Sequence, residues 1–284
     1  MRKIATAIIL ALLVGQFVSA RQAPGGSAPS PVGDALVDIG GRRLHVSCTG
    51  AGNPTVILEA GLGRVASSTI WKAVQPAVAE ITRVCAYDRA GRGTSDPDPR
   101  TATEFRTGRA AVEDLRLLLR AASITGPYVL VGHSLGGAYT RLYAGQFPQD
   151  VVGMVLVDAS HEEQNVSFKS AGYSEPPEPT GQNPERTDLS AVLEELRQAH
   201  WRADIPLVVL SHGRKLPLPN TSDEVLTRVE AAWLELQREL ASRSSRGRLV
   251  IAQRSGHNVQ NDEPELVVEA IREVVAAARG TVAR

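Results

Sequence analysis

Residues 128–136 read YVLVGHSLG, an apolar run that ends in Gly-x-Ser-x-Gly, and residues 137–144 continue with a helix-like sequence. Ser134 is therefore expected on a sharp turn between a strand and a helix. Gly132 and Gly136 leave room for a strained backbone that lifts the hydroxyl above the sheet edge, while the helix N-terminus directs unpaired N–H groups toward incoming negative charge. This arrangement predicts a nucleophile. The alternative is a tight turn whose serine only caps the helix.

The first 20 residues have the three parts of a secretory signal peptide. Met1-Arg2-Lys3 is charged, residues 4–14 are apolar, and Val18-Ser19-Ala20 is a small-residue cleavage site. An uncleaved anchor is the alternative, although the apolar run is short for a membrane span. Residues 21–33 are rich in Gly, Pro, Ser and Ala, which favours a flexible leader. The mature protein is therefore expected to be secreted or periplasmic.

Charge and length restrict the function further. The chain has 31 basic and 31 acidic residues, and loss of Arg2 and Lys3 with the signal peptide leaves 29 basic residues and a net charge of −2. This balance favours neither nucleic acid nor an anionic membrane as a partner of the mature form, and the sequence specifies no oligomeric state. Residues 34–284 are long enough for one large α/β domain with a full core.

Short apolar runs alternate with amphipathic stretches along this domain, the pattern of a mainly parallel sheet covered by helices. The turn-forming segment 49–54 favours an antiparallel start of the sheet. Apolar stripes predict helices around 112–119 and 266–275, and Pro264 suits the first turn of the latter. The predicted strands are Leu44–Cys48, Thr55–Glu59, Arg83–Tyr87, Tyr128–Gly132, Val152–Asp158, Pro206–Ser211 and Arg248–Ala252.

Four motifs, in this order, resemble those of the α/β-hydrolase superfamily. They are Glu59-Ala60-Gly61-Leu62-Gly63, the segment from Tyr87 to Ser95 (YDRAGRGTS), Gly132–Gly136 and Ser255-Gly256-His257. The chain is most similar to a subgroup of secreted or membrane-associated bacterial hydrolases with one cysteine in the second strand and one in the fourth. The resemblance implies a mainly parallel eight-stranded sheet with helices on both faces and a short cap inserted at about residues 159–204.

A serine nucleophile needs a base, and His257 is the best candidate. It lies between the predicted strand at 248–252 and the last helix, where the superfamily carries its catalytic histidine; the alternative is a surface histidine in a turn. His133 is only the variable residue of the serine turn, and His45, His200 and His212 lack such a context.

The acid that orients His257 departs from the common superfamily pattern, because no carboxylate follows the strand at 206–211 until Asp223. Asp158 ends the preceding strand next to the serine turn, and haloalkane dehalogenases resemble this chain in placing their acid there. Asp158 is therefore predicted to hold His257 in the right tautomer. Asp223 is the alternative, and either residue could instead be a helix or strand-end cap.

Acyl transfer to a serine also needs hydrogen-bond donors for the oxyanion that develops on the carbonyl oxygen. The backbone N–H of Leu135 is one candidate, and the resemblance places the second at Leu62, with Gly61 and Gly63 allowing close backbone approach. A purely structural glycine turn is the alternative. An unpaired Glu59 would oppose the oxyanion, so we predict that Glu59 pairs with Arg89.

Three further expectations concern the rest of the chain. Cys48 and Cys85 fall in strands that are neighbours in this sheet order, and an oxidising compartment favours a Cys48–Cys85 disulfide over two buried thiols. No metal and no cofactor are expected, because the metal-ligating residue types form no recognisable ligand motif. Trp233 and Leu234 suit either a pocket wall or a helix core, and we favour the core.

The sequence thus predicts a serine hydrolase that cleaves a small or medium carboxylic ester, its small-molecule partner, through an acyl-enzyme intermediate. Ser134 acts as nucleophile, His257 as base and Asp158 as orienting acid. The alternatives are hydrolysis of an amide, a lactone or a carbon–carbon bond, perhydrolysis, and a non-catalytic receptor that keeps the pocket.

Overall fold

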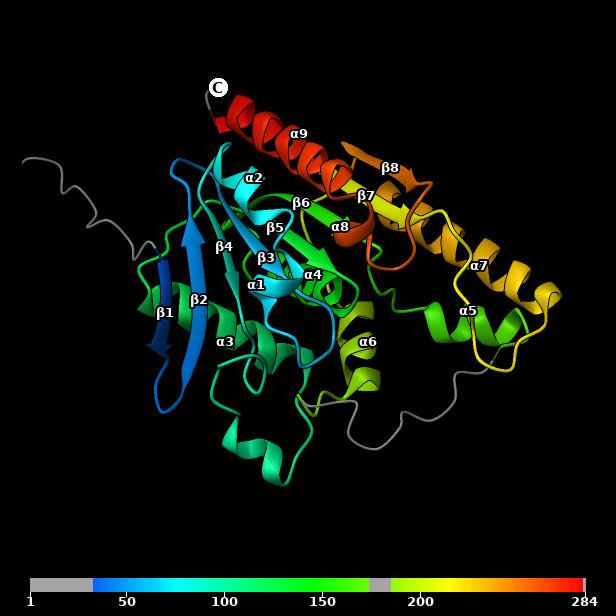
Figure 1. The fold of residues 1–284 in the computed structure, drawn as a ribbon, viewed down its shortest axis with the longest axis horizontal. Helices are drawn as coiled ribbons and strands as arrows, with labels where there is room; N and C mark the ends of the chain where they lie inside the picture. The colour runs from blue at the N-terminus through cyan, green and yellow to red at the C-terminus, as the bar shows by residue number, and fades with distance from the viewer. Residues whose placement is uncertain (1–32, 174–184, 283–284) are drawn as a thin grey trace, which may run out of the picture.

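A computed structural model describes residues 33–173 and 185–282 (Figure 1). At its centre is an eight-stranded sheet in the order β1-β2-β4-β3-β5-β6-β7-β8. The β1–β2 and β2–β4 pairs are antiparallel and all other pairs are parallel, which confirms the predicted fold class and the antiparallel start. The strands are β1 (Gly33–Asp38), β2 (Arg43–Thr49), β3 (Thr55–Glu59), β4 (Val84–Tyr87), β5 (Tyr128–His133), β6 (Val151–Val157), β7 (Leu207–His212) and β8 (Gly247–Ala252).

Strands β2 to β8 match the seven predicted segments to within one residue at each end. The prediction missed β1, which begins at Gly33, the last residue assigned to the leader. β1 is an edge strand whose residues alternate between half-buried and exposed, and it carries Asp34 and Asp38. It therefore lacks the continuous apolar run by which the central strands were recognised.

Helices cover both faces of the sheet, and Figure 1 shows α3 and α9 on opposite sides of it. Alternate residues of the strands supply the two cores, as Leu130 packs into one and Val129 and Val131 into the other. The predicted apolar stripes form the buried faces of α3 and α9, and Pro264 begins α9. The helices are α1 (Ser67–Ile70), α2 (Gln75–Ala79), α3 (Gly108–Ala121), α4 (Leu135–Gln146), α5 (Gln164–Ser170), α6 (Leu189–Arg197), α7 (Asp223–Ser242), α8 (Val259–Asp262) and α9 (Pro264–Val282), with a 3₁₀ turn at Pro99–Ala102.

The segment expected to form a cap, residues 159–204, carries α5 and α6 in its described parts. α5 packs along α7, where Phe168, Ala171 and Tyr173 contact Val225 and Val229 in a small apolar cluster (Figure 1). α6 packs instead on α3 and α4. The two helices therefore rest on different parts of the domain.

Cys48 and Cys85 are directly paired across β2 and β4 and form a disulfide, as the sequence predicted. The bond closes a loop of 37 residues and ties the antiparallel edge of the sheet to its parallel part.

The predicted signal peptide, residues 1–20, and nearly all of the predicted leader lie outside the described residues. Within the described part of the chain, no helix combines the length and the apolar character needed to cross a membrane.

Candidate active site

Ser134 lies at the turn between β5 and α4, and its φ of 54° and ψ of −125° are unusual for a residue with a side chain. Its N–H donates to the carbonyl of Val157 at 3.1 Å, which fixes the turn to the end of β6. A Cβ on Gly132 would lie 2.6 Å from the carbonyl oxygen of Gly136, so this strand-to-helix crossing requires glycine. The local backbone has the strained form expected of a nucleophile turn.

Asp158 and His257 meet at the same edge of the sheet. Asp158 follows β6 with a φ of 45° and is fully buried, and Nδ1–H of His257 donates to its Oδ2 at 2.6 Å. This bond leaves Nε2 of His257 as the nitrogen available for proton transfer. The predicted alternative, Asp223, is instead exposed in the first turn of α7.

Asp158 also accepts hydrogen bonds from two residues that the sequence analysis did not assign to the site. Nδ1–H of His212 donates to the Asp158 carboxylate at 2.8 Å, and Nε1–H of Trp233 donates to Oδ1 at 2.9 Å. Burial alone would raise the pKa of Asp158, but the hydrogen bonds from His212 and His257 outweigh it and hold the pKa well below its usual range. Asp158 is thus a stable carboxylate.

His212 is the main residue that the sequence analysis missed. Its Nε2–H donates to Glu230 at 2.9 Å, so both ring nitrogens face carboxylates. Burial opposes its charged form, yet the hydrogen bonds to Asp158 and Glu230 raise the pKa of His212 to about 9. The sequence did contain one indication of this position. His212 ends β7 and Asp158 follows β6, and the carboxyl ends of these neighbouring parallel strands lie at the same edge of the sheet.

For Trp233, the favoured interpretation as plain helix core is wrong. The side chain is buried, but it lines the same cavity as Ser134 and holds Asp158 through its indole N–H. The helical pattern of α7 could show that position 233 faces inward, but not that it faces a carboxylate.

His133 has a role beyond that of a variable turn residue. Its ring packs against that of His257, with centroids 4.7 Å apart, and its Nε2 lies 2.9 Å from the His257 carbonyl oxygen. Burial, with repulsion from His257, lowers the pKa of His133 to about 3. A neutral His133 can donate Nε2–H to this carbonyl and so hold the loop that carries His257.

The loop after β3 approaches the serine turn closely. A Cβ on Gly61 would lie 3.0 Å from both Cβ of Ser134 and Nδ1 of His133, and Gly63 has a φ of 142°. Across residues 33–173 and 185–282, the N–H groups of Leu62 and Leu135 donate to no other backbone group. Leu135 is the first residue of α4, so its N–H has no partner within the helix. Both N–H groups are therefore candidate donors to a ligand.

A cavity of about 270 Å³ connects Ser134 with Asp158, His212 and His257. Ser134 and His257 both line it, and no direct hydrogen bond connects their side chains in the described residues; such bonds often tighten only when a substrate is bound. The other lining residues are Asp158, Ser160, Gln164, Phe168, His212, Leu216, Leu218, Val229, Glu230 and Trp233.

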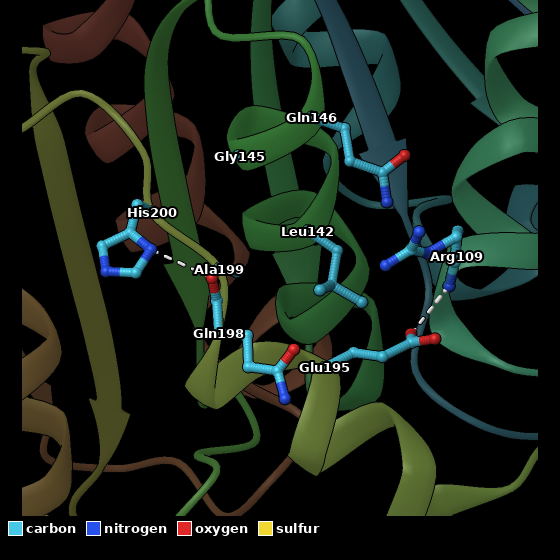
Figure 2. Close-up of a pocket in the computed structure, with 8 residues that line it drawn as sticks. All are labelled: Arg109, Leu142, Gly145, Gln146, Glu195, Gln198, Ala199 and His200. Atoms are coloured by element: carbon cyan, nitrogen blue, oxygen red, sulfur yellow. Dashed lines mark hydrogen bonds between the residues drawn. The ribbon is translucent and has the colours of Figure 1, made fainter.

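A second cavity, of about 210 Å³, lies between α3, α4 and α6 (Figure 2). Its charged and polar side chains are those of Arg109, Gln146, Glu195, Gln198 and His200, and the backbone N–H of Arg109 donates to Glu195 at 2.8 Å. Among the described residues, its lining contains no serine, threonine or cysteine. The Ser134 cavity is therefore the candidate active site.

Comparison with known proteins agrees with this fold. A family model described as the alpha/beta hydrolase fold matches residues 54–258. The chain belongs to this family. It is similar to the uncharacterized protein YqjL of Bacillus subtilis (strain 168), with 31% identity over 81% of this chain and 86% of the relative. It is 27% identical to an AB hydrolase superfamily protein of Gibberella zeae, over 80% of this chain and 87% of the relative.

Solved structures of this family share the fold. A thermophilic esterase from Thermogutta terrifontis matches with a TM-score of 0.57 and 21% identity, over 86% of this chain and 98% of the esterase. At this identity the match establishes the architecture of the hydrolase-family chain and not its substrate.

Proposed function

We propose that this α/β-hydrolase-fold protein is a serine hydrolase that cleaves a small or medium carboxylic ester through an acyl-enzyme intermediate. The observation that carries the proposal is the 2.6 Å hydrogen bond between Asp158 and His257, both of which line one cavity with Ser134. Three residues from different segments of the sequence thus line one cavity, which supports a triad in which His257 would activate the serine.

In the proposed mechanism, the Ser134 hydroxyl attacks the ester carbonyl while Nε2 of His257 takes its proton. Asp158 stabilises the imidazolium, and the N–H groups of Leu62 and Leu135 bind the oxyanion. His257 then donates the proton to the departing alcohol, which leaves an acyl group on Ser134. A water molecule, activated by His257, hydrolyses this intermediate and releases the carboxylic acid.

The cavity supports a small or medium apolar substituent. Its volume of about 270 Å³ leaves room for a substituent of this size. The side chains of Phe168, Leu218 and Val229 form an apolar wall, which favours an uncharged aliphatic or aromatic group.

We also propose that the protein works outside the cytoplasm. Residues 1–20 have the pattern of a signal peptide, and the Cys48–Cys85 disulfide is of the kind that persists in oxidising compartments.

The test combines covalent labelling with a substrate panel. A fluorophosphonate should label the wild type and Ser160→Ala, a serine variant in the same cavity, but not Ser134→Ala. On p-nitrophenyl esters of increasing acyl length, Ser134→Ala should lower kcat by at least about 10³-fold. Labelling that persists in Ser134→Ala would refute the nucleophile.

The same panel should include an anilide and a lactone. Turnover of one of these with no ester hydrolysis would assign another reaction of the fold to the site. A folded wild type that is neither labelled nor active would favour a binding protein.

A further inference from the structure

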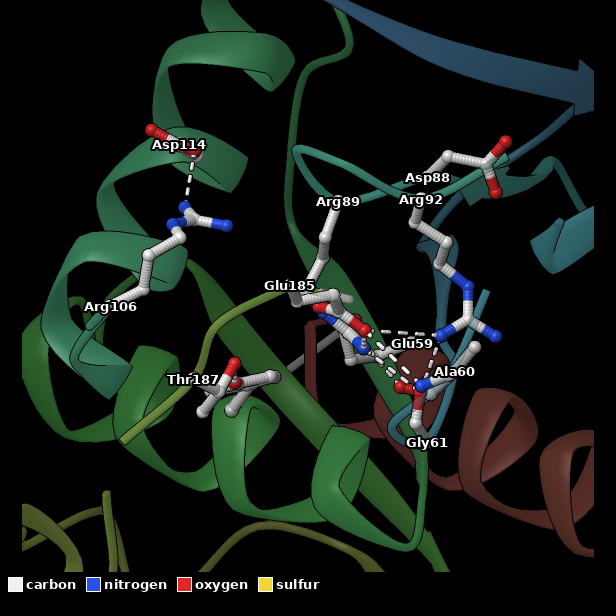
Figure 3. Close-up of polar contacts among 12 residues, drawn as sticks. Glu59, Ala60, Gly61, Asp88, Arg89, Arg92, Arg106, Asp114, Glu185 and Thr187 are labelled. Carbon is white, nitrogen blue, oxygen red and sulfur yellow. Dashed lines mark hydrogen bonds and ion pairs between the residues drawn. The ribbon is translucent and has the colours of Figure 1, made fainter. Parts of the chain in front are cut away.

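Four charged side chains form a buried network beneath the loop that carries Leu62 (Figure 3). Arg89 pairs with Glu59, as the sequence predicted, and also with Glu185, whose Oε1 accepts from its Nη2 at 2.7 Å. Arg92 lies 3.4 Å from the same Glu185 oxygen. Two guanidinium groups thus face two carboxylates, so the network is electrically neutral, and Glu59 presents no unpaired charge to the site.

Both arginines bind the carbonyl groups of this loop. Nη2 of Arg89 donates to the Gly61 carbonyl at 2.8 Å, and Nη1 of Arg92 donates to the same oxygen at 2.6 Å. Nη1 of Arg89 also donates to the carbonyl of Ala60 at 2.5 Å. The Gly61 carbonyl therefore receives two charge-assisted hydrogen bonds, which fill both of its lone pairs.

These bonds also set the direction of the Leu62 N–H. The Gly61–Leu62 peptide is trans, so its C=O and N–H point in opposite directions. Gly61 itself packs against Ser134. Rotation of this peptide would break both hydrogen bonds to the arginines, which would then have, in the described part of the chain, only the two carboxylates and the Ala60 carbonyl as acceptors.

We propose that Arg89 and Arg92 are positioning residues that orient and polarise the Gly61–Leu62 peptide, so that its N–H is a fixed, strengthened donor for an anionic ligand atom. Cationic donors on a peptide carbonyl strengthen the N–H of the same group, because linked hydrogen bonds polarise one another. In the proposed hydrolase, this ligand atom is the oxyanion, so that part of the inference rests on the proposed function.

Arg92 is the better residue to change, because loss of Arg89 would leave Glu59 and Glu185 without their main partner. Arg92→Met removes one donor to Gly61, whereas Arg92→Lys keeps a charge and a donor. Arg106→Met is the matched control: Arg106 is equally buried and pairs with Asp114 at 2.6 Å, away from the loop (Figure 3).

The kinetic test uses the ester that the wild type hydrolyses best. Arg92→Met should lower kcat by about 10- to 100-fold, because a misplaced oxyanion donor loses transition-state stabilisation. KM should change by less than about 2-fold, since ground-state binding does not use this donor. Phenylboronic acid, which mimics the tetrahedral intermediate, should lose affinity in parallel with kcat. Arg92→Lys should recover part of both losses, and Arg106→Met should change neither.

A second readout needs no turnover. In protein labelled with ¹⁵N-leucine, the Leu62 amide signal, assigned by its loss in Leu62→Ile, should shift in Arg92→Met but not in Arg106→Met. An unchanged signal together with unchanged kcat would overturn the inference. A wild type that hydrolyses no ester would refute the proposed function, and the Leu62 signal would still decide whether Arg92 positions the peptide.

Discussion

His212 makes the stability of this protein depend on pH in a window where few other groups titrate. The side chain is only 3% exposed and donates to Asp158 and Glu230. Its pKa rises from 6.5 to about 9 on folding, which corresponds to about 3 kcal/mol of stabilisation. Because the folded-state pKa is the higher one, this stabilisation is fully present below pH 6.5 and is lost as the pH rises through 9.

The assay is urea unfolding between pH 6 and pH 9.5, followed by circular dichroism without reductant. The wild type should lose about 3 kcal/mol more unfolding free energy across this range than His212→Gln, which cannot titrate. His200→Gln is the control, because His200 is exposed and lies outside the Ser134 cavity; it should follow the wild type. Parallel curves for the wild type and His212→Gln would refute the reasoning.

Three further outcomes follow from the structure. In the double variant Cys48→Ala, Cys85→Ala, the unfolding free energy measured in urea should be about 4 kcal/mol lower, because the disulfide closes a 37-residue loop. The wild type with reductant should approach the value of the variant. Equal unfolding midpoints for the oxidised wild type, the reduced wild type and the variant would contradict this. Trp233→Phe keeps an aromatic ring, although a smaller one, and removes the donor to Asp158, so the unfolding free energy should fall by at least about 1.5–3 kcal/mol. An unchanged value would mean that this bond contributes little. Phe168→Ala should shift the preferred ester toward longer acyl chains, because Phe168 lines the cavity. Val166→Ala, on the exposed side of the same helix, should keep the acyl-length preference of the wild type. Identical acyl-length preferences for the wild type and Phe168→Ala would place the acyl group elsewhere.

Local sequence patterns were sufficient to predict most of the strands and the fold class. The central strands are apolar runs bounded by turn residues, and each was located to within one residue. β1 was not predicted, because an edge strand with only one covered face has a weaker pattern of apolar residues. Strand-end positions also indicated the candidate site, since Ser134 and Asp158 follow neighbouring parallel strands.

The charge network illustrates the limit of such patterns. The pairing of Glu59 with Arg89 was predicted because a lone carboxylate next to an oxyanion site would be unfavourable. Glu185 was not anticipated, because it lies 96 residues from Arg89, and the described residues between them include two strands and three α-helices. Nothing in the local sequence around Glu185 marks it as buried.

The sequence by itself determined the strand, turn and helix at Ser134 and the order of the motifs, and it named the candidate base and acid, because these depend on side-chain type and local spacing. Tertiary structure alone decided that His212 and Trp233 share Asp158 with His257; these three residues follow Asp158 by 54 to 99 residues. It also decided that two arginines hold the Gly61 carbonyl. The physical reason is that a buried charge requires partners from whichever segments the packed sheet brings next to it, and sequence distance does not reveal which segments these are.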